Sequence, residues 1–221
     1  MYNSPMNIVQ LKKLIGLNVF TTEMLKPILE QEYAQPTKKI NSMVARGELI
    51  RLKRGVYALS EDYRDHPINM FAIANILHKP SYVSYEYALS YHGLIPERVY
   101  TVTSATTYRP ETYTTELGTF SYKKIPSNAY SIGIDWKFDK HDGGYMIATA
   151  EKALCDQVYA DQRIANIKKD EILEYLEDDQ RIEWEELEKL DSTLLWKISM
   201  AYSSSKLRDM TASIKKRQKD D

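Results

Sequence analysis

PTKKINSMVARGELIRLKRGVYAL, residues 36–59, predicts a helix that is followed directly by a hairpin of two short strands. Pro36 suits the first turn of a helix, because its missing N–H would have no partner there. Gly47 ends the helix at a position that favours a left-handed backbone. Apolar and basic residues then alternate with strand period over 50–53, and the chain turns at 54–55 before a second strand returns.

The two faces of this predicted helix differ in chemistry. One face is apolar and needs a core, and it carries Thr37, Ile40, Met43 and Val44. The other face is polar and basic, with Lys38, Ser42 and Ala45, flanked by Lys39, Asn41 and Arg46. A helix of this kind with a basic hairpin behind it is typical of a winged helix-turn-helix. The helix fits a DNA major groove, and the hairpin reaches the adjacent backbone.

Two further helices are expected before residue 36. The first carries Ile8, Leu11, Leu14 and Ile15 and ends at Gly16. Thr21 is placed to cap the second helix, and Glu23 lies in its first turn, where a carboxylate favours the helix dipole. Pro27 would remove a hydrogen bond inside this helix, so we expect it to be very short or broken near Lys26.

Charge is unevenly distributed along the chain. Residues 1–60 carry nine Lys/Arg and four Asp/Glu, a balance of +5, and the remainder carries a balance of −6. This distribution predicts that only the first quarter approaches a polyanion. The candidate DNA-binding residues are Thr37, Lys38, Lys39, Asn41, Ser42, Arg46, Arg51, Lys53 and Arg54. Those on the helix would reach bases or phosphates, and the last three would grip the backbone or the minor groove from the hairpin.

Several strings of the sequence resemble AbiEi-type proteins, the antitoxins of type IV toxin–antitoxin systems. The most specific is GELIRLKRGVY at 47–57, supported by FTT at 20–22 and INSMV at 40–44. Two more lie further along the chain, SYEYALSYHGLIP at 84–96 and IATAEKALCD at 147–156. The resemblance therefore covers most of the chain, most strongly at these motifs.

The resemblance implies a regulator of transcription linked to phage abortive infection. Proteins of this family repress their own operon by binding inverted repeats in double-stranded DNA. Their C-terminal domain counteracts a nucleotidyltransferase-like toxin, and no stable complex with that toxin is required. Direct contact with a toxin is therefore left open for this chain.

We expect an α+β fold with two domains. The first is a winged helix-turn-helix over residues 1–62, and the second is a mixed α/β domain over 67–221 that ends in a helical region from about 149. Pro67 is expected to begin the first helix of this second domain, after a linker at 63–67. Strands are expected at 82–83, 100–103, 120–125, 130–134 and 145–147, where β-branched and aromatic residues dominate.

Two other functions stay open from the sequence. The second domain could be a nucleic-acid-processing enzyme with converging carboxylates, the candidates being Glu86, Asp135, Asp139 and Asp142. However, Asp139, His141 and Asp142 precede 143–144 (Gly-Gly) in a predicted hairpin turn, which favours turn chemistry. Alternatively, the second domain could sense a ligand or a protein in a transcription factor that has no toxin. We predict no catalytic, metal-binding or cofactor-binding residues.

The sequence favours a cytoplasmic location with no membrane contact. No apolar run approaches the ~20 residues that a membrane span needs, and no signal peptide is evident at the start. Cys155 is the only cysteine, so no disulfide can form within the chain, and we expect it to be a small buried residue.

Overall fold

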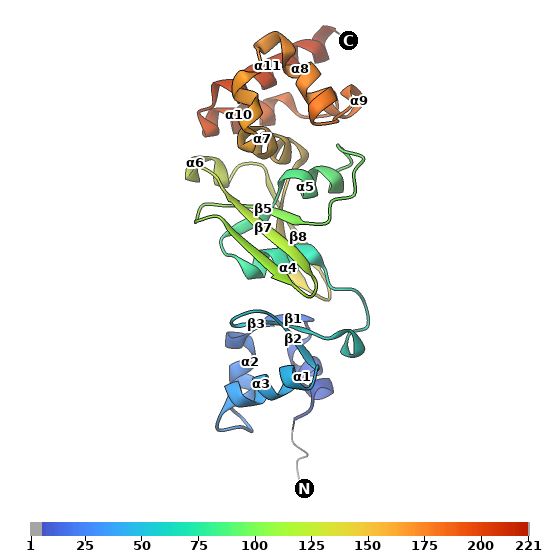
Figure 1. Ribbon diagram of the computed structural model, residues 1–221, viewed down its shortest axis with the longest axis vertical. Coiled ribbons are helices and arrows are strands. Elements are labelled where there is room, and N and C mark those ends of the chain that lie inside the picture. Colours follow the sequence, from blue (N-terminus) through green and yellow to red (C-terminus); the bar gives the residue numbers. More distant parts are fainter. Residues whose placement is uncertain (1–5, 221) are drawn as a thin grey trace.

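The computed structural model describes residues 6–220 and shows a mixed α+β protein, as expected. Its parts follow one another along the long axis of the molecule (Figure 1). A small group of helices and strands forms the N-terminal end, a larger sheet forms the middle, and helices form the C-terminal end.

The N-terminal part alternates short helices and strands. Its elements are α1 (Ile8–Ile15), β1 (Val19–Thr21), α2 (Thr22–Leu29), α3 (Pro36–Ala45), β2 (Leu49–Lys53) and β3 (Val56–Leu59). The three strands form an antiparallel sheet in the order β1-β3-β2. A capping box of Asn7 and Gln10 begins α1, and Gly16 ends it in the left-handed conformation, as expected.

Pro27 does not break α2. The helix is short, with eight residues, and runs through the proline to Leu29. Leu25 and Leu29 on its inner face are fully buried. Their packing holds the helix together although one backbone hydrogen bond is missing.

α3 begins at Pro36 and stops before Gly47, as the sequence predicts. Gly47 has φ +70°, and the N–H of Glu48 donates to the carbonyl of Met43 at 3.0 Å, which closes the helix end. Ile40 and Met43 are buried as expected. Thr37 is exposed, so its place in the apolar stripe was wrong.

The larger sheet has six strands and both strand directions. They are β4 (Ser81–Val83), β5 (Val102–Thr106), β6 (Glu111–Thr115), β7 (Gly118–Lys124), β8 (Ile134–Asp139) and β9 (Gly143–Ala148), in the order β6-β7-β5-β4-β9-β8. β4 runs parallel to β9 and β5 parallel to β7, and the other pairs are antiparallel.

The predicted strands agree only in part. β5 begins at Val102 instead of residue 100, and the segment expected at 130–134 contains the end of α6 (Ser127–Tyr130) before β8 begins at Ile134. β6 was missed, because its sequence ETYTT has only one apolar residue.

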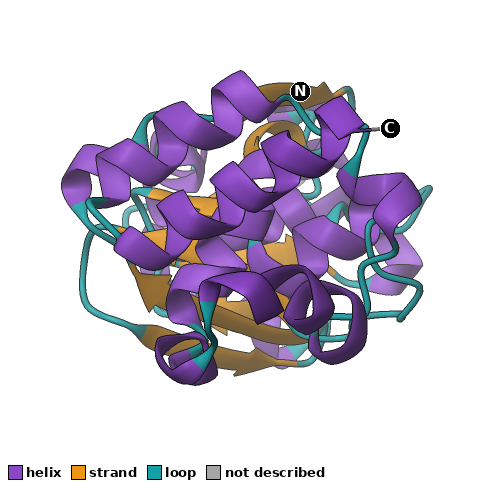
Figure 2. Cartoon of the chain, turned by 90° about the horizontal axis from the view of Figure 1, so that it is seen from above, coloured by secondary structure: helices purple, strands orange, loops and turns teal. Residues whose placement is uncertain are grey.

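Helices cover the larger sheet and form the C-terminal end (Figure 2). Besides α6 they are α4 (Met70–Leu77), α5 (Tyr85–Tyr91), α7 (Ala150–Ala160), α8 (Ile172–Glu174), α9 (Trp184–Leu187), α10 (Ser192–Tyr202) and α11 (Ser205–Asp220). The helical region from about 149 is therefore confirmed. Pro67 does not begin α4; Asn69 caps it instead, with its side chain accepting from the N–H groups of Phe71 and Ala72.

The small sheet has apolar residues on both of its faces. One face packs on the three N-terminal helices through Phe20, Leu49, Tyr57 and Leu59. The other joins the core of the larger sheet through Val19, Leu52, Val56 and Ala58. Every residue of β3 is therefore buried, and one three-stranded sheet serves two cores.

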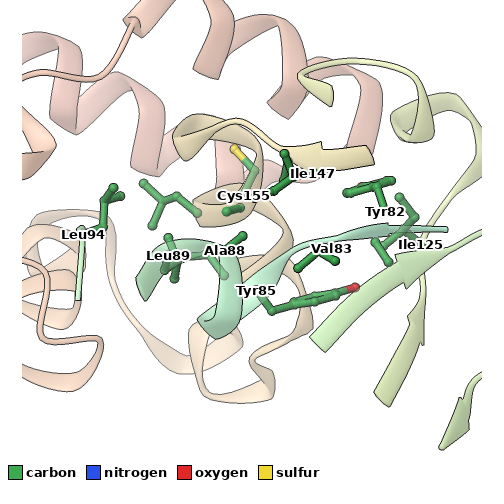
Figure 3. Packing of buried hydrophobic residues seen from close by; sticks show 14 of the residues in the cluster. Tyr82, Val83, Tyr85, Ala88, Leu89, Leu94, Ile125, Ile147 and Cys155 are labelled. Carbon is green, nitrogen blue, oxygen red and sulfur yellow. The ribbon is translucent and has the colours of Figure 1, made fainter. Parts of the chain in front are cut away.

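The main core lies around β4, α5 and α7. Ala88 and Leu89 of α5 lie close to Cys155 of α7, with Val83 of β4 beside them (Figure 3). Cys155 is fully buried, as expected, and burial raises the pKa of its thiol well above the usual range.

Candidate nucleic-acid interface

α3 lies at the N-terminal end of the molecule, and one of its faces is open. Its inner face is buried on α2 and β2, whereas Thr37, Lys38, Asn41 and Arg46 are exposed. In Figure 1 the larger sheet lies on the far side of the small one. Nothing in the described chain covers the outer face of α3, so it is accessible to a large partner.

Arg51 of β2 joins this face of α3. Its Nη2 donates to Asn41 Oδ1 at 3.5 Å and to the hydroxyl of Tyr57 at 3.4 Å. The guanidinium carbon lies 5.7 Å from the centre of the Tyr57 ring. A residue expected on the hairpin therefore stands beside the middle of the helix, and the two elements present one surface.

Arg46 is held by its neighbours. Its Nη1 donates to Ser42 Oγ at 2.6 Å, and its Nε and Nη2 donate to the two oxygens of Glu48 at 3.1 and 2.7 Å. The hydrogen bond to Glu48 raises the pKa of Arg46. This exposed ion pair fixes the side chain along the end of α3 and offsets part of its charge.

Lys53 lies apart from Arg51, contrary to what alternation along a regular strand predicts. The pairing of β2 with β3 shifts between Arg51 and Lys53, and an extra residue in one strand reverses the side on which the next side chain lies. The Nζ of Lys53 donates to the carbonyl of Leu77 and lies 5.0 Å from the centre of the Tyr113 ring. Burial there lowers its pKa. Lys53 therefore faces the larger sheet.

The turn of the hairpin lies beside the start of α2. The carbonyl of Gly55 accepts from the N–H of Thr22 at 2.9 Å, and Gly55 has φ +83°, which a glycine adopts readily. Arg54 is exposed at this turn. On α3, the Nζ of Lys39 lies 4.7 Å from the centre of the Tyr33 ring. Both cations remain near the surface.

The acidic residues between β8 and β9 have the turn role expected for them. Asp139 Oδ1 accepts from the N–H groups of His141 and Asp142 at 2.8 and 3.0 Å. Asp142 is buried and accepts from the side chain of Asn18 and the N–H of Asn69. Between residues 6 and 220 no group of three or more His, Cys, Asp or Glu is arranged to hold a metal ion.

A fully buried ion pair, not foreseen from the sequence, lies in α7. Lys152 and Asp156 of α7 are both 0% exposed, with Nζ 2.8 Å from Oδ1. Three hydroxyls donate to the same carboxylate, those of Tyr82 and Ser84 at 2.7 Å and that of Tyr202 at 2.5 Å. Lys152 also donates to the carbonyl of residue 129 at 2.8 Å. The pair thereby ties α7 to β4, α6 and α10.

This ion pair explains two of the sequence motifs in structural terms. Ser84 is the residue before α5, but its hydroxyl donates to Asp156 and makes no capping bond. Glu151, in the same motif as the pair, accepts from the N–H of Asp191 at 3.0 Å. The Nε2 of His92, at the end of α5, lies 2.7 Å from the carbonyl oxygen of Ala148, the last residue of β9. Burial, together with the charge of Asp156, raises the pKa of Tyr82 and Tyr202. These motifs therefore build the core.

Residues 10–60 match the family model for the transcriptional regulator AbiEi antitoxin. The resemblance expected from the sequence is thus confirmed for this segment. The AbiEi match does not extend to the motifs at 84–96 and 147–156. No curated protein matches the chain.

None of the described helices has the length and apolar character needed to cross a membrane.

Proposed function

We propose that this chain is a sequence-specific, DNA-binding transcriptional regulator of the AbiEi antitoxin type, and not an enzyme. The proposal rests on the family match of residues 10–60 together with the exposed polar face of α3 that Arg51 extends. The order α1-β1-α2-α3-β2-β3, with a three-stranded sheet behind the helices, supports a winged helix-turn-helix. DNA binding is assigned to residues 1–62.

In this proposal α3 lies in the major groove. Asn41 and Arg46 contact base edges, and Lys38 and Ser42 contact bases or nearby phosphates. Thr37, Lys39, Arg51 and Arg54 contact the phosphate backbone around the groove. Lys53 takes no part, because its ammonium group is bonded to the carbonyl of Leu77 on the side of the larger sheet.

The remaining assignments follow from the resemblance to AbiEi proteins. The chain represses its own operon in the cytoplasm by binding inverted repeats, and residues 67–221 counteract a nucleotidyltransferase-like toxin. The buried ion pair of Lys152 and Asp156 supports a scaffolding role for the second domain rather than an enzymatic one. Both groups are fully buried, so a substrate cannot reach them.

A mobility-shift assay on the DNA upstream of the protein's own gene tests the proposal. The chain should bind that fragment more tightly than a scrambled fragment of the same length, with affinity falling steeply as salt rises. Equal affinity for the two fragments would refute sequence-specific regulation. Arg51→Ala should weaken binding, and Lys168→Ala serves as the matched control, because that lysine is exposed on the C-terminal part.

The antitoxin assignment needs a separate experiment. Co-expression with a nucleotidyltransferase encoded beside the gene should restore growth that the nucleotidyltransferase alone arrests. Absence of rescue by a chain that binds its operator normally would leave a regulator without antitoxin activity.

A further inference from the structure

The strand β8 is an edge of the larger sheet, and it exposes two large aromatic side chains. It pairs only with β9 in the sheet. Trp136 is 66% exposed and Phe138 is 65% exposed, and their rings stack with centres 5.9 Å apart. Exposed edges that carry apolar side chains are sites of strand addition. The other edge strand, β6, is approached by the N-terminal part through Tyr113 and Lys53.

The residues of β8 that carry these aromatic side chains also have backbone N–H and C=O groups that point away from β9. The N–H of Thr149 donates to the carbonyl of Gly133 at 2.9 Å, and the register continues from Ile134 opposite Ala148 to Asp139 opposite Gly143. Hydrogen-bonded residues alternate along an antiparallel pair. Gly133, Asp135 and Lys137 therefore bond to β9, and Ile134, Trp136 and Phe138 direct their N–H and C=O groups away from it.

Contacts on the other side of β9 agree with this alternation. The side chain of Asn75 bonds both the N–H and the carbonyl of Met146, at 2.8 and 3.2 Å. The N–H and C=O of Met146 thus point away from β8. The alternation requires this, because the residues on either side of Met146 in β9 are the ones that bond to β8.

We propose that β8 pairs with β8 of a second copy of this chain, antiparallel and with the two-fold axis at Trp136. This register places Ile134 opposite Phe138 of the second copy and Trp136 opposite its own symmetry mate. All the backbone groups that point outward are then paired. On the other face of the extended sheet, Asp135 lies opposite Lys137, so each of the two symmetry-related pairs joins opposite charges.

Charge selects this register over its neighbours. An axis at Asp135 would place two aspartates opposite each other, and an axis at Lys137 would place two lysines opposite each other, and both arrangements are unfavourable. If the axis lay between two residues, each outward backbone group would face a residue of the second copy whose own groups are already bonded to β9. The two strands could then form no hydrogen bonds. An axis at Phe138 would also join opposite charges, Lys137 and Asp139, but Ile134 would then lie opposite residue 142, outside the strand, and its outward groups would stay unpaired. The axis at Trp136 is therefore the favoured one, and the interface is isologous.

The pairing can be tested without DNA, so its failure and that of the proposed function are distinguishable. Sedimentation velocity at ~100 μM should give twice the chain mass of 25.7 kDa, because a micromolar dimer is mostly assembled at that concentration. A wild-type chain that stays monomeric there would overturn the proposal.

Charge reversal gives the sharper test. Asp135→Lys and Lys137→Asp should each raise the dissociation constant roughly tenfold to a hundredfold, because two symmetric pairs change from attraction to repulsion. Mixing the two single variants should restore dimers, since every pair then joins opposite charges again. The double variant Asp135→Lys with Lys137→Asp should also dimerise.

Two controls separate the interface from folding. Thr114→Lys adds a charge to the opposite edge, where Thr114 is exposed on β6, and it should leave the dimer intact. Tyr91→Phe removes the hydroxyl that accepts from Lys137 at 3.0 Å, and it should also leave the dimer intact. Dimers that persist in both single charge variants, or variants that stay monomeric when mixed, would rule out this register.

Discussion

Replacement of Lys152 by methionine should strongly destabilise the second part of the protein. The change keeps an unbranched side chain of similar length but removes the ammonium group, which lies 2.8 Å from Asp156. Asp156 would remain fully buried with its three hydroxyl donors and without its cation. Removing one partner of a buried ion pair costs about 3–5 kcal/mol. We therefore expect a loss of this size in the free energy of unfolding.

Urea denaturation at pH 7 measures this loss, with tryptophan fluorescence as the signal. Trp184 and Trp196 lie in the C-terminal part and report on its unfolding. The double variant Lys152→Met with Asp156→Asn should be more stable than Lys152→Met alone, because it no longer buries an unpaired charge.

A matched surface pair provides the control. Lys168 and Glu171 form an exposed ion pair at 3.2 Å, so Lys168→Met should cost no more than about 0.5 kcal/mol. If Lys152→Met cost as little as this control, or if the double variant were less stable than the single one, the electrostatic account of the buried pair would be refuted.

Five other substitutions have definite expected outcomes. Asn41→Ala should cost ~1–3 kcal/mol of discrimination at the base it contacts, so an unchanged binding-site preference would remove it from base reading. Arg51→Ala should weaken binding to all DNA and flatten its salt dependence, whereas Lys53→Ala should leave both unchanged and lower the stability by ~1 kcal/mol in urea denaturation. Gly47→Ala should lower the unfolding free energy by ~1 kcal/mol, because alanine is strained at the φ of +70° that Gly47 adopts. An unchanged unfolding free energy would contradict this reasoning. The pKa of Asp161 is lowered to about 2, chiefly by hydrogen bonds from Arg163. The stabilisation from this carboxylate is therefore present above its ordinary pKa of ~3.9 and is lost as the pH falls through 2. In Asp161→Asn, the free energy of unfolding should fall less steeply between pH 4 and 2.

Local signals made the helices and the hairpin of the N-terminal part predictable from the sequence, whereas β1, which forms by pairing with β3, was not predicted. Pro36, Gly16 and Gly47 mark helix ends through their own backbone geometry, and the alternation in 50–53 marks a strand, so no distant contact had to be known. The match of residues 10–60 to the AbiEi model agrees with this prediction.

Features that depend on tertiary contacts could not be predicted. Alternation placed Lys53 beside Arg51, but the register shift that separates them forms only where β2 meets β3 and the larger sheet. Lys152 and Asp156 have the four-residue spacing of an ordinary surface pair, and only the packing of β4, α6 and α10 around them shows that they are buried.

The candidate interface was foreseen in composition but not in geometry. The sequence indicated which face of α3 is polar. It did not indicate that Glu48 restrains Arg46 or that Arg51 contacts Asn41, because both contacts depend on the angle between α3 and β2.

The double-faced sheet of β1, β2 and β3 also limits how the chain can be divided. A fragment ending after Leu59 would leave the apolar side formed by Val19, Leu52, Val56 and Ala58 in contact with water. Such a fragment should self-associate or unfold. The N-terminal part would thus depend on the larger sheet for its solubility, and it could be transferred to another protein only together with a surface that covers these four residues.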